Sequence, residues 1–294
     1  MKPNLSAYIE ETRSLINQTL LDFIKPQSIP NPLRESMIYS IEAGGKRIRP
    51  ILMIACCQAF GGNLEKVLPV AAALEMIHTY SLIHDDLPAM DDDDLRRGRP
   101  TNHIQFNEAT AILAGDGLLT LSFQMISQAN QLTDNQKVYV IQRLSEASGI
   151  TGMVAGQMLD IELEDQDISI EQLEEIHQLK TGQLFIYAME IGAYLADAPS
   201  EKLTDIIDCA TQLGLVFQIQ DDILDITGDQ VKLGKTIGSD LDKNKSTYPK
   251  LLGLSGAIQQ KEIKINQAKR ALEKAGISDS ILAQLIEYLS DREQ

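Results

Sequence analysis

The sequence predicts an all-α protein, built as a single large helical bundle with a central cavity. Apolar residues recur at helical spacing through almost the whole chain, while alternating strand patterns bounded by turns are hard to find. Residues 67–84 and 153–161 carry small or apolar side chains on most of their faces, which is typical of helices in the centre of a bundle. No segment has the composition of a linker, so residues 1–294 are expected to form one domain.

The expected helices follow one another along the chain and are separated by stretches rich in Gly and Pro. From the periodicity, helices are expected at residues 5–24, 32–43, 49–60, 64–86, 107–130, 135–162, 169–195, 199–227, 246–273 and 277–291. The breaks fall at "KPQSIPNP" (25–32), "AGGKRIRP" (43–50), "FGGN" (60–63), "RRGRP" (96–100) and "TGDQVKLGKTIGSD" (227–240).

The charge balance limits the ligands that the protein can attract. The chain of 294 residues has 26 Lys and Arg against 42 Asp and Glu, a formal net charge of −16. A field of this sign repels nucleic acid and anionic membranes. An anionic ligand must therefore be captured by a local basic patch or through bridging cations.

The cysteines and the N-terminus indicate a cytoplasmic protein. Cys56, Cys57 and Cys209 are odd in number and lack C-x-x-C spacing, so neither a disulfide framework nor a zinc site is expected. The N-terminus lacks a charged region followed by an uninterrupted apolar one, and no run of about 18 apolar residues occurs. We therefore expect no membrane insertion.

Two acidic clusters, far apart in the sequence, each follow an apolar helical stretch. They read "HDDLPAMDDDD" (84–94) and "DDILD" (221–225). In the second, Asp221 and Asp225 share one helix face, while Asp222 points about 100° away. Either cluster alone could be a solvated acidic face, but together they are what two facing walls of one cavity would supply.

The acidic clusters suit a divalent cation. Apolar residues flank Asp221 and Asp225, and an unpaired carboxylate beside such a surface costs several kcal/mol. In the first cluster Pro88 ends regular helix, so Asp85 and Asp91 converge only if the chain bends. Mg²⁺ binds such oxygen ligands together with substrate phosphates, whereas the spacing of an EF-hand loop is absent.

Four basic segments lie at positions that break helices. They contain Lys46, Arg47 and Arg49 after Gly44 and Gly45; Arg96, Arg97 and Arg99; Lys180 beside Thr181; and Lys232 and Lys235. Glycines before a basic run let the backbone approach a phosphate closely. A surface ion pair remains the alternative for any one of these side chains taken alone.

These motifs, in this order, resemble the trans-isoprenyl diphosphate synthases, the polyprenyl synthetase family, and most closely its bacterial farnesyl diphosphate synthases. The resemblance runs from "GGKRIRP" (44–50) to "KSTYPKLLG" (245–253) and includes both aspartate-rich motifs with their flanks. It implies a prenyltransferase that ionises dimethylallyl or geranyl diphosphate with Mg²⁺ and couples the cation to isopentenyl diphosphate. A geranylgeranyl diphosphate synthase is the alternative within the family. A class I terpene cyclase and a non-catalytic prenyltransferase subunit are the rivals outside it.

The resemblance also implies roles for individual residues. Asp85, Asp91, Asp221 and Asp225 would hold the metal, with three Mg²⁺ expected and Mn²⁺ as a possible replacement. Asp86 and Asp222 would support them as further catalytic carboxylates. Isopentenyl diphosphate would contact Lys46, Arg49, His78 and Arg97, and the allylic diphosphate would contact Arg96, Lys180, Thr181, Gln218 and Lys235. Gln157 and Asp160, in "GQMLD", match the family without a clear role.

Tyr80 is the candidate for the residue that limits product length. It precedes Asp85 by five residues, which places it about 7.5 Å deeper along the same helix. By resemblance, a tyrosine here acts as the floor of the pocket and favours a C15 product; a packed core tyrosine is the compatible alternative. A homodimer is also expected from the family. The glycine-containing segment 227–245 is expected to close over the substrates.

Overall fold

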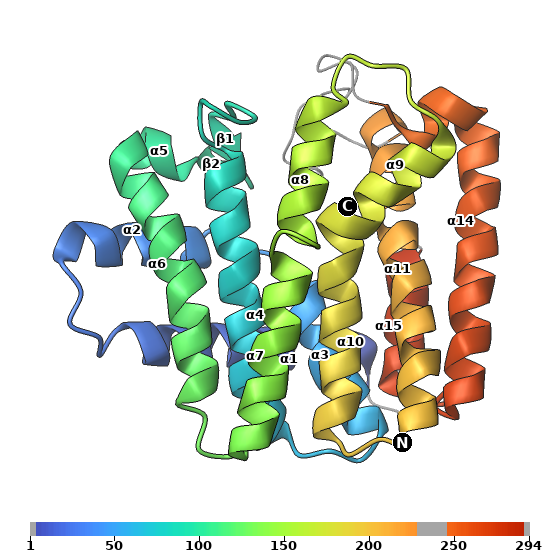
Figure 1. Ribbon diagram of the computed structural model, residues 1–294, viewed down its shortest axis with the longest axis horizontal. Coiled ribbons are helices and arrows are strands. Elements are labelled where there is room, and N and C mark those ends of the chain that lie inside the picture. The colour runs from blue at the N-terminus through green and yellow to red at the C-terminus, as the bar shows by residue number, and fades with distance from the viewer. Residues whose placement is uncertain (1–3, 228–245, 291–294) are drawn as a thin grey trace.

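The computed structural model describes residues 4–227 and 246–290, which form a bundle of long helices (Figure 1). The elements are α1 (Leu5–Ile24), α2 (Asn31–Glu42), α3 (Ile48–Ala59), α4 (Leu64–Asp85), β1 (Leu95–Arg96), β2 (Arg99–Pro100), α5 (Asn102–Gln105), α6 (Glu108–Ser127), α7 (Asp134–Ser148), α8 (Met153–Glu162), α9 (Ile170–His177), the π-helical turn η1 (Gln178–Gly182), α10 (Gln183–Leu195), α11 (Ser200–Thr227), α14 (Tyr248–Ala275) and α15 (Ile281–Ser290). The predicted all-α class is confirmed. Most of the expected closing segment, together with Lys232 and Lys235, lies outside the described residues.

The predicted helix over 135–162 is wrong, because the chain breaks it into α7 and α8. Gly149 adopts an extended conformation between the two helices, and Gly152, with φ of −133° and ψ of −123°, is also non-helical. A Cβ atom on Gly152 would lie 2.2 Å from the carbonyl oxygen of Ala147. The apolar periodicity continues on both sides of this tight turn, so the pattern alone did not reveal it.

A short β-hairpin that the sequence did not predict follows the first acidic cluster. β1 pairs with β2 in antiparallel register, with Leu95 opposite Pro100 and Arg96 opposite Arg99. Arg97 and Gly98 both have positive φ, which is the conformation of a tight hairpin turn. Each strand is two residues long, too short to produce an alternating pattern.

The core is centred on α4, as the sequence predicted, whereas the prediction of a central helix over 153–161 is wrong, because only Met153 and Gly156 of α8 are buried. The side chains of α4 from Ala71 to Ile77 are almost completely enclosed by α3, α6 and α10. By length and composition α4 and α6 could each cross a membrane, but 67% of the apolar window of α4 is buried within the protein, against 39% for α6. Burial of this kind is what the core helix of a bundle requires, so the two helices are weak evidence for a membrane span.

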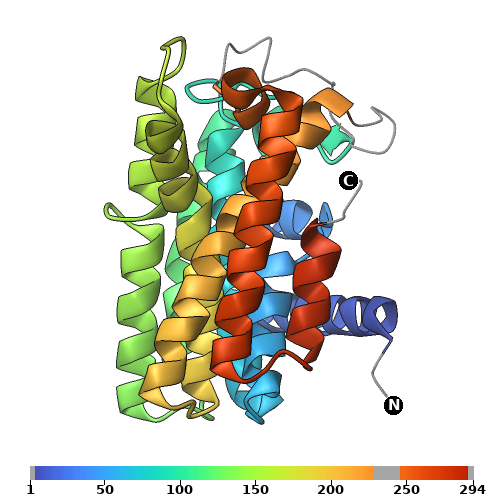
Figure 2. The same cartoon turned by 90° about the vertical axis from the view of Figure 1, so that its right-hand side faces the viewer.

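The helices that carry the two acidic clusters run in the same direction. α4 ends at Asp85 and α11 ends at Thr227, and both C-terminal ends lie at the same end of the bundle, uppermost in Figures 1 and 2. The hairpin formed by β1 and β2 lies at this end as well. The fold therefore brings the chemically distinctive segments to one end of the molecule.

Candidate active site

A cavity of about 390 Å³ lies between α4 and α8 and is closed at its side by the π-helical turn. Its polar lining consists of Arg49, His78, Ser81, His84, Asp85, Gln157, Lys180 and Thr181, and Tyr80, methionines and leucines belong to its apolar lining. A cavity with a few polar groups and a long apolar section suits a ligand with a charged head and a hydrocarbon tail.

Asp85 faces this cavity from the last position of α4. Its carboxylate accepts a hydrogen bond from the side-chain amide of Gln157 on α8. The chain bends back after Pro88, because the backbone N–H of Asp91 donates to the carbonyl oxygen of Asp85 at 2.9 Å. This is the bend that Asp85 and Asp91 would need in order to act together.

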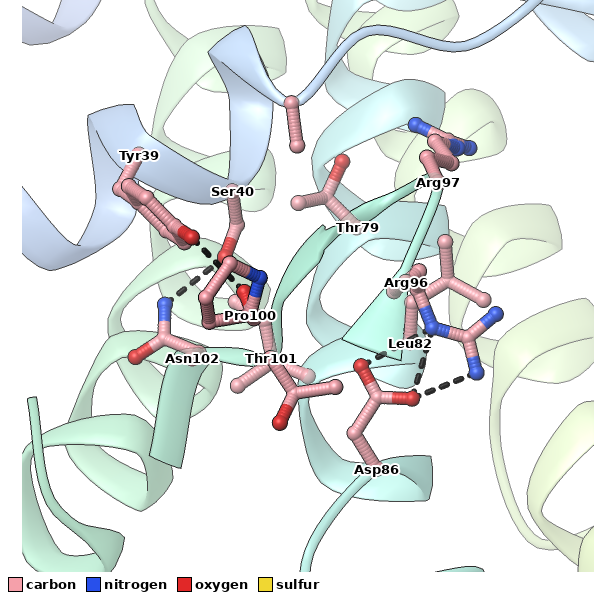
Figure 3. Close-up of a pocket in the computed structure, with 12 residues that line it drawn as sticks. Tyr39, Ser40, Thr79, Leu82, Asp86, Arg96, Arg97, Pro100, Thr101 and Asn102 are labelled. Atoms are coloured by element: carbon pink, nitrogen blue, oxygen red, sulfur yellow. Dashed lines mark hydrogen bonds and ion pairs between the residues drawn. The ribbon is translucent and has the colours of Figure 1, made fainter. Parts of the chain in front are cut away.

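The neighbouring Asp86 has a different partner. Its side chain is only 4% exposed and accepts from Nε of Arg96 at 2.6 and 2.9 Å, with a second guanidinium nitrogen at 2.5 Å (Figure 3). Burial alone would lower the pKa of Arg96, but the hydrogen bonds and charge of Asp86 outweigh it and raise that pKa. The two groups form a charged pair beside a pocket of about 30 Å³, and Arg96 does not line the larger cavity.

A cluster of arginines surrounds His78 on α4. Its imidazole lies 3.4 Å from a guanidinium nitrogen of Arg49 on α3. Burial and the positive charges of Arg49, Arg97, Arg47 and Arg96, in that order, hold the pKa of His78 well below 6.5. The ring is therefore neutral at pH 7, and the positive field around it favours an anion.

Arg47 fixes the loop that carries this cluster. It is 3% exposed and has φ of 54°, and it donates to Glu75 on α4 at 2.7 Å and to Asn17 on α1 at 2.9 Å. A further bond to the carbonyl oxygen of Gly44, at 3.0 Å, closes the loop on itself. The role of Glu75 could not be predicted from the sequence, because an acidic residue in an apolar helix gives no sign of its partner.

Gly45 allows a close approach of the hairpin to the same loop. Arg97 donates to the carbonyl oxygen of Gly44, and its guanidinium occupies the space where a Cβ of residue 45 would stand. The φ of +132° at Gly45 also disfavours any other residue. Lys46, Arg49, His78 and Arg97, predicted to bind one substrate together, thus come from three segments that the fold brings side by side.

The π-helical turn presents Lys180 and Thr181 to the cavity. Lys180 forms an ion pair with Asp160 of α8 at 2.7 Å, and the hydroxyl of Thr181 donates to the side-chain oxygen of Gln218 on α11 at 3.0 Å. A Cβ on Gly156 would lie 2.1 Å from the backbone nitrogen of Lys180, so glycine is what lets α8 pack directly on this turn.

In the second acidic cluster, on α11, Asp221 and Asp225 are half-buried and Asp222 is buried, and none of the three is among the residues that line the cavity. Asp222 accepts a hydrogen bond at 2.9 Å from the backbone N–H of Tyr248, the first residue of α14. As the helical spacing predicted, the middle carboxylate points away from the other two. It connects α11 to α14 instead.

The donor set fits a divalent cation that is also bound by substrate. Within residues 4–227 and 246–290, no three His, Cys, Asp or Glu side chains converge closely enough to hold an ion alone. Mg²⁺ needs no such cage, because it keeps several waters and binds through one or two carboxylates plus phosphate oxygens. Asp85 lines the cavity and is a carboxylate of this kind, whereas Asp91 and Asp221 are not among the residues that line it.

Comparison with known proteins identifies the family. Residues 30–289 match the polyprenyl synthetase family, and the chain belongs to it. The chain is 43% identical to the farnesyl diphosphate synthase of Bacillus subtilis over 295 aligned positions, covering 100% of both chains. It is 45% identical to the geranylgeranyl diphosphate synthase of Cyanophora paradoxa, covering 92% of this chain and 93% of the relative. A geranyltransferase structure from Legionella pneumophila superposes with a TM-score of 0.87 at 35% identity, covering 98% and 97% of the two chains.

Proposed function

We propose that the protein is a farnesyl diphosphate synthase, a prenyltransferase that extends dimethylallyl and geranyl diphosphate with isopentenyl diphosphate. The observation that carries this proposal is the lining of the cavity, which combines Asp85 and Lys180, the cationic cluster of Arg49 and His78, and the apolar surroundings of Tyr80. The part with Asp85 and Lys180 suits the allylic diphosphate with its cation, and the cationic cluster suits a second diphosphate. Two anion sites beside one apolar pocket are what a coupling of two prenyl diphosphates requires.

The allylic diphosphate would lie between the two acidic walls. A bound divalent cation supplies Lewis-acid stabilisation of the negative charge that develops on the leaving diphosphate. Mg²⁺ is the cation that we propose, with Asp85, Asp91, Asp221 and Asp225 as its protein ligands and three ions per site. Lys180 would neutralise further charge on the same group, and Lys235 is proposed for this role from the sequence alone.

The second diphosphate would bind without metal. Arg49 and Arg97 carry the positive charge, and the neutral ring of His78 can donate one hydrogen bond. Arg47 and Glu75 keep the loop in place, so that Lys46 and Arg49 are held before the substrate arrives. The hydroxyl of Thr181 and the amide of Gln218 would face the developing allylic cation with dipoles.

Tyr80 supports a C15 product. It is 7% exposed, lines the cavity and lies about 7.5 Å from Asp85 along α4. The chain is about equally identical to a farnesyl and a geranylgeranyl diphosphate synthase, so we infer the product length from the residues of the pocket. A terpene cyclase would have no use for the second cationic cluster, and a non-catalytic subunit would be expected to lose an aspartate motif.

We also propose a cytoplasmic homodimer, in line with the family. α6 supports this, since Ile112 and Leu113 on its outer face are 42% and 58% exposed. An apolar face of this kind on a long helix suits a second copy of the chain. Sedimentation of the purified protein would give a mass near twice 32.5 kDa.

The test of function is an assay of the purified protein with isopentenyl and dimethylallyl diphosphates and Mg²⁺, with dephosphorylated products sized by mass spectrometry. Farnesol is expected, and it should vanish when EDTA is added. Geranylgeraniol would preserve the reaction and remove the role of Tyr80. Absence of any elongation by folded protein would contradict the proposed function.

A further inference from the structure

The side chain of His84 on α4 packs against α6 at a position formed by Ile112 and Gly115, which we call its seat. Its Nε2 donates to the carbonyl oxygen of Ile112 at 3.0 Å and lies 3.9 Å from a carboxylate oxygen of Asp116. The ring rests on Gly115, where a Cβ atom would stand 2.1 Å from Nε2 and within 3 Å of two further ring atoms. The ring can occupy this seat only because residue 115 has no side chain.

The same imidazole contacts Tyr80 one turn earlier on α4. The two ring centroids are 5.8 Å apart and the planes meet at 77°, an edge-on packing that is favourable for aromatic rings. Both rings line the 390 Å³ cavity. Tyr80 is therefore packed against a side chain that is itself fixed to another helix.

We propose that His84 is a positioning residue that sets product length by bracing Tyr80 from its seat on Gly115. The inference deepens the proposed function, on which it rests. Tyr80 supplies the bulk that stops the growing chain, and His84 keeps that bulk from moving aside. His84 needs no contact with the diphosphate for this role.

Replacement of His84 by Ala tests the brace. Loss of one edge-on aromatic contact is expected to raise the ratio of C20 to C15 product about fivefold. In His84→Ala, kcat/KM should change when farnesyl or geranyl diphosphate is the primer. It should stay constant for dimethylallyl diphosphate, which is too short to reach Tyr80. A general loss of structure would lower all three values together.

Replacement of Gly115 by Ala tests the seat. The substitution favours helix by about 1 kcal/mol, so α6 should persist, while the His84 ring must leave its seat. We expect the displaced ring to enter the cavity and C10 product to accumulate. Gly117→Ala is the matched control on α6, because its Cβ would meet only Met37 at an ordinary 3.4 Å, and it should retain C15 product.

The double variant His84→Ala with Gly115→Ala completes the test. It should match His84→Ala alone, because no ring is left to displace. Unchanged C15 output from both single variants, with active wild type, would overturn the brace and leave the proposed function intact. Failure of the wild-type protein to elongate any primer would instead remove the proposed function, which separates the two failures.

Discussion

In each of the two acidic clusters one aspartate has a structural partner, and the two partners differ in kind. On the first wall Asp85 faces the cavity, while Asp86 is paired with Arg96, ten residues away. On the second wall Asp221 and Asp225 share one face, while Asp222 accepts from the backbone of Tyr248, 26 residues away. In each cluster, then, one carboxylate maintains the structure so that its neighbours can be held in place for a ligand. Substitution of one aspartate should therefore lower activity, whereas substitution of its neighbour should lower stability.

The largest effect is expected for activity when a cavity carboxylate is neutralised. Asp85→Asn removes one proposed metal ligand, and a loss of several kcal/mol of transition-state stabilisation corresponds to about a 10³-fold lower rate. Asp92→Asn makes the same change of charge in the same cluster, at a residue with φ of 52° that asparagine tolerates. Steady-state rates with Mg²⁺ should fall for the first variant only. Equal rates for both would remove the distinction between Asp85 and its neighbours.

Stability should respond instead when Asp86 is changed. Asp86→Asn removes the nearest and most buried counter-charge of the mostly enclosed guanidinium of Arg96, which should lower the free energy of unfolding by about 3 kcal/mol. Asp93→Asn is the control, since Asp93 lies 3.7 Å from Arg96 and is 34% exposed, and it should cost less than about 1 kcal/mol. Urea denaturation measures both values. A loss confined to Asp93→Asn would contradict the assigned pairing.

The stability of the protein should depend on pH through His177 at the end of α9. Its ring packs against the ring of Tyr248 on α14, with 5.8 Å between the centroids. Burial, aided by Lys180 and opposed by Asp160, lowers the pKa of His177 to about 4. The unfolded chain binds this proton at about 6.5, so stability is complete above pH 6.5 and falls as the pH drops towards 4. The contribution is at most about 3 kcal/mol.

The variant His177→Phe keeps a ring in this position and has no proton to gain. Unfolding measured at pH 7.5 and pH 4.5 should show a smaller loss of stability at low pH for the variant than for the wild type. An identical loss in the two proteins would mean that other groups carry the pH dependence.

The smallest effect is expected for the link between α11 and α14. Asp222→Ala removes the acceptor of the Tyr248 N–H, and an unsatisfied buried donor costs about 2 kcal/mol. Asp222→Asn keeps an acceptor oxygen and should retain most of that stability. Thermal unfolding distinguishes the two variants, and equal melting temperatures would show that the bond is dispensable.

The sequence predicted the parts of this arrangement that depend on local periodicity. The apolar run before Asp85 defined α4 almost to the residue, and the i, i+4 spacing separated Asp221 and Asp225 from Asp222. The partner of Asp86 could not be predicted in this way, because Arg96 reaches it through a hairpin with strands too short for a pattern. The partner of Asp222 begins a different helix.

Other misses have a similar physical origin. The predicted helix over 169–195 is continuous, but periodicity did not reveal the wider turn at Gln178–Gly182 that exposes Lys180 and Thr181 together. The predicted helix over 135–162 failed at Gly149 and Gly152, where backbone packing rather than apolar spacing decides the conformation. The placement of residues 228–245 lies outside the described structure.

The π-helical turn makes this part of the chain sensitive to a change in its length. Such a turn contains one residue more than an α-helical turn, so α9 and α10 continue one another while their side-chain registers differ by one position. Each residue of an α-helix adds about 100° of rotation, so loss of one residue from this turn would rotate every side chain of α10 relative to α9 by that amount. A deletion here is therefore expected to be more harmful than a deletion in a surface loop of the same protein.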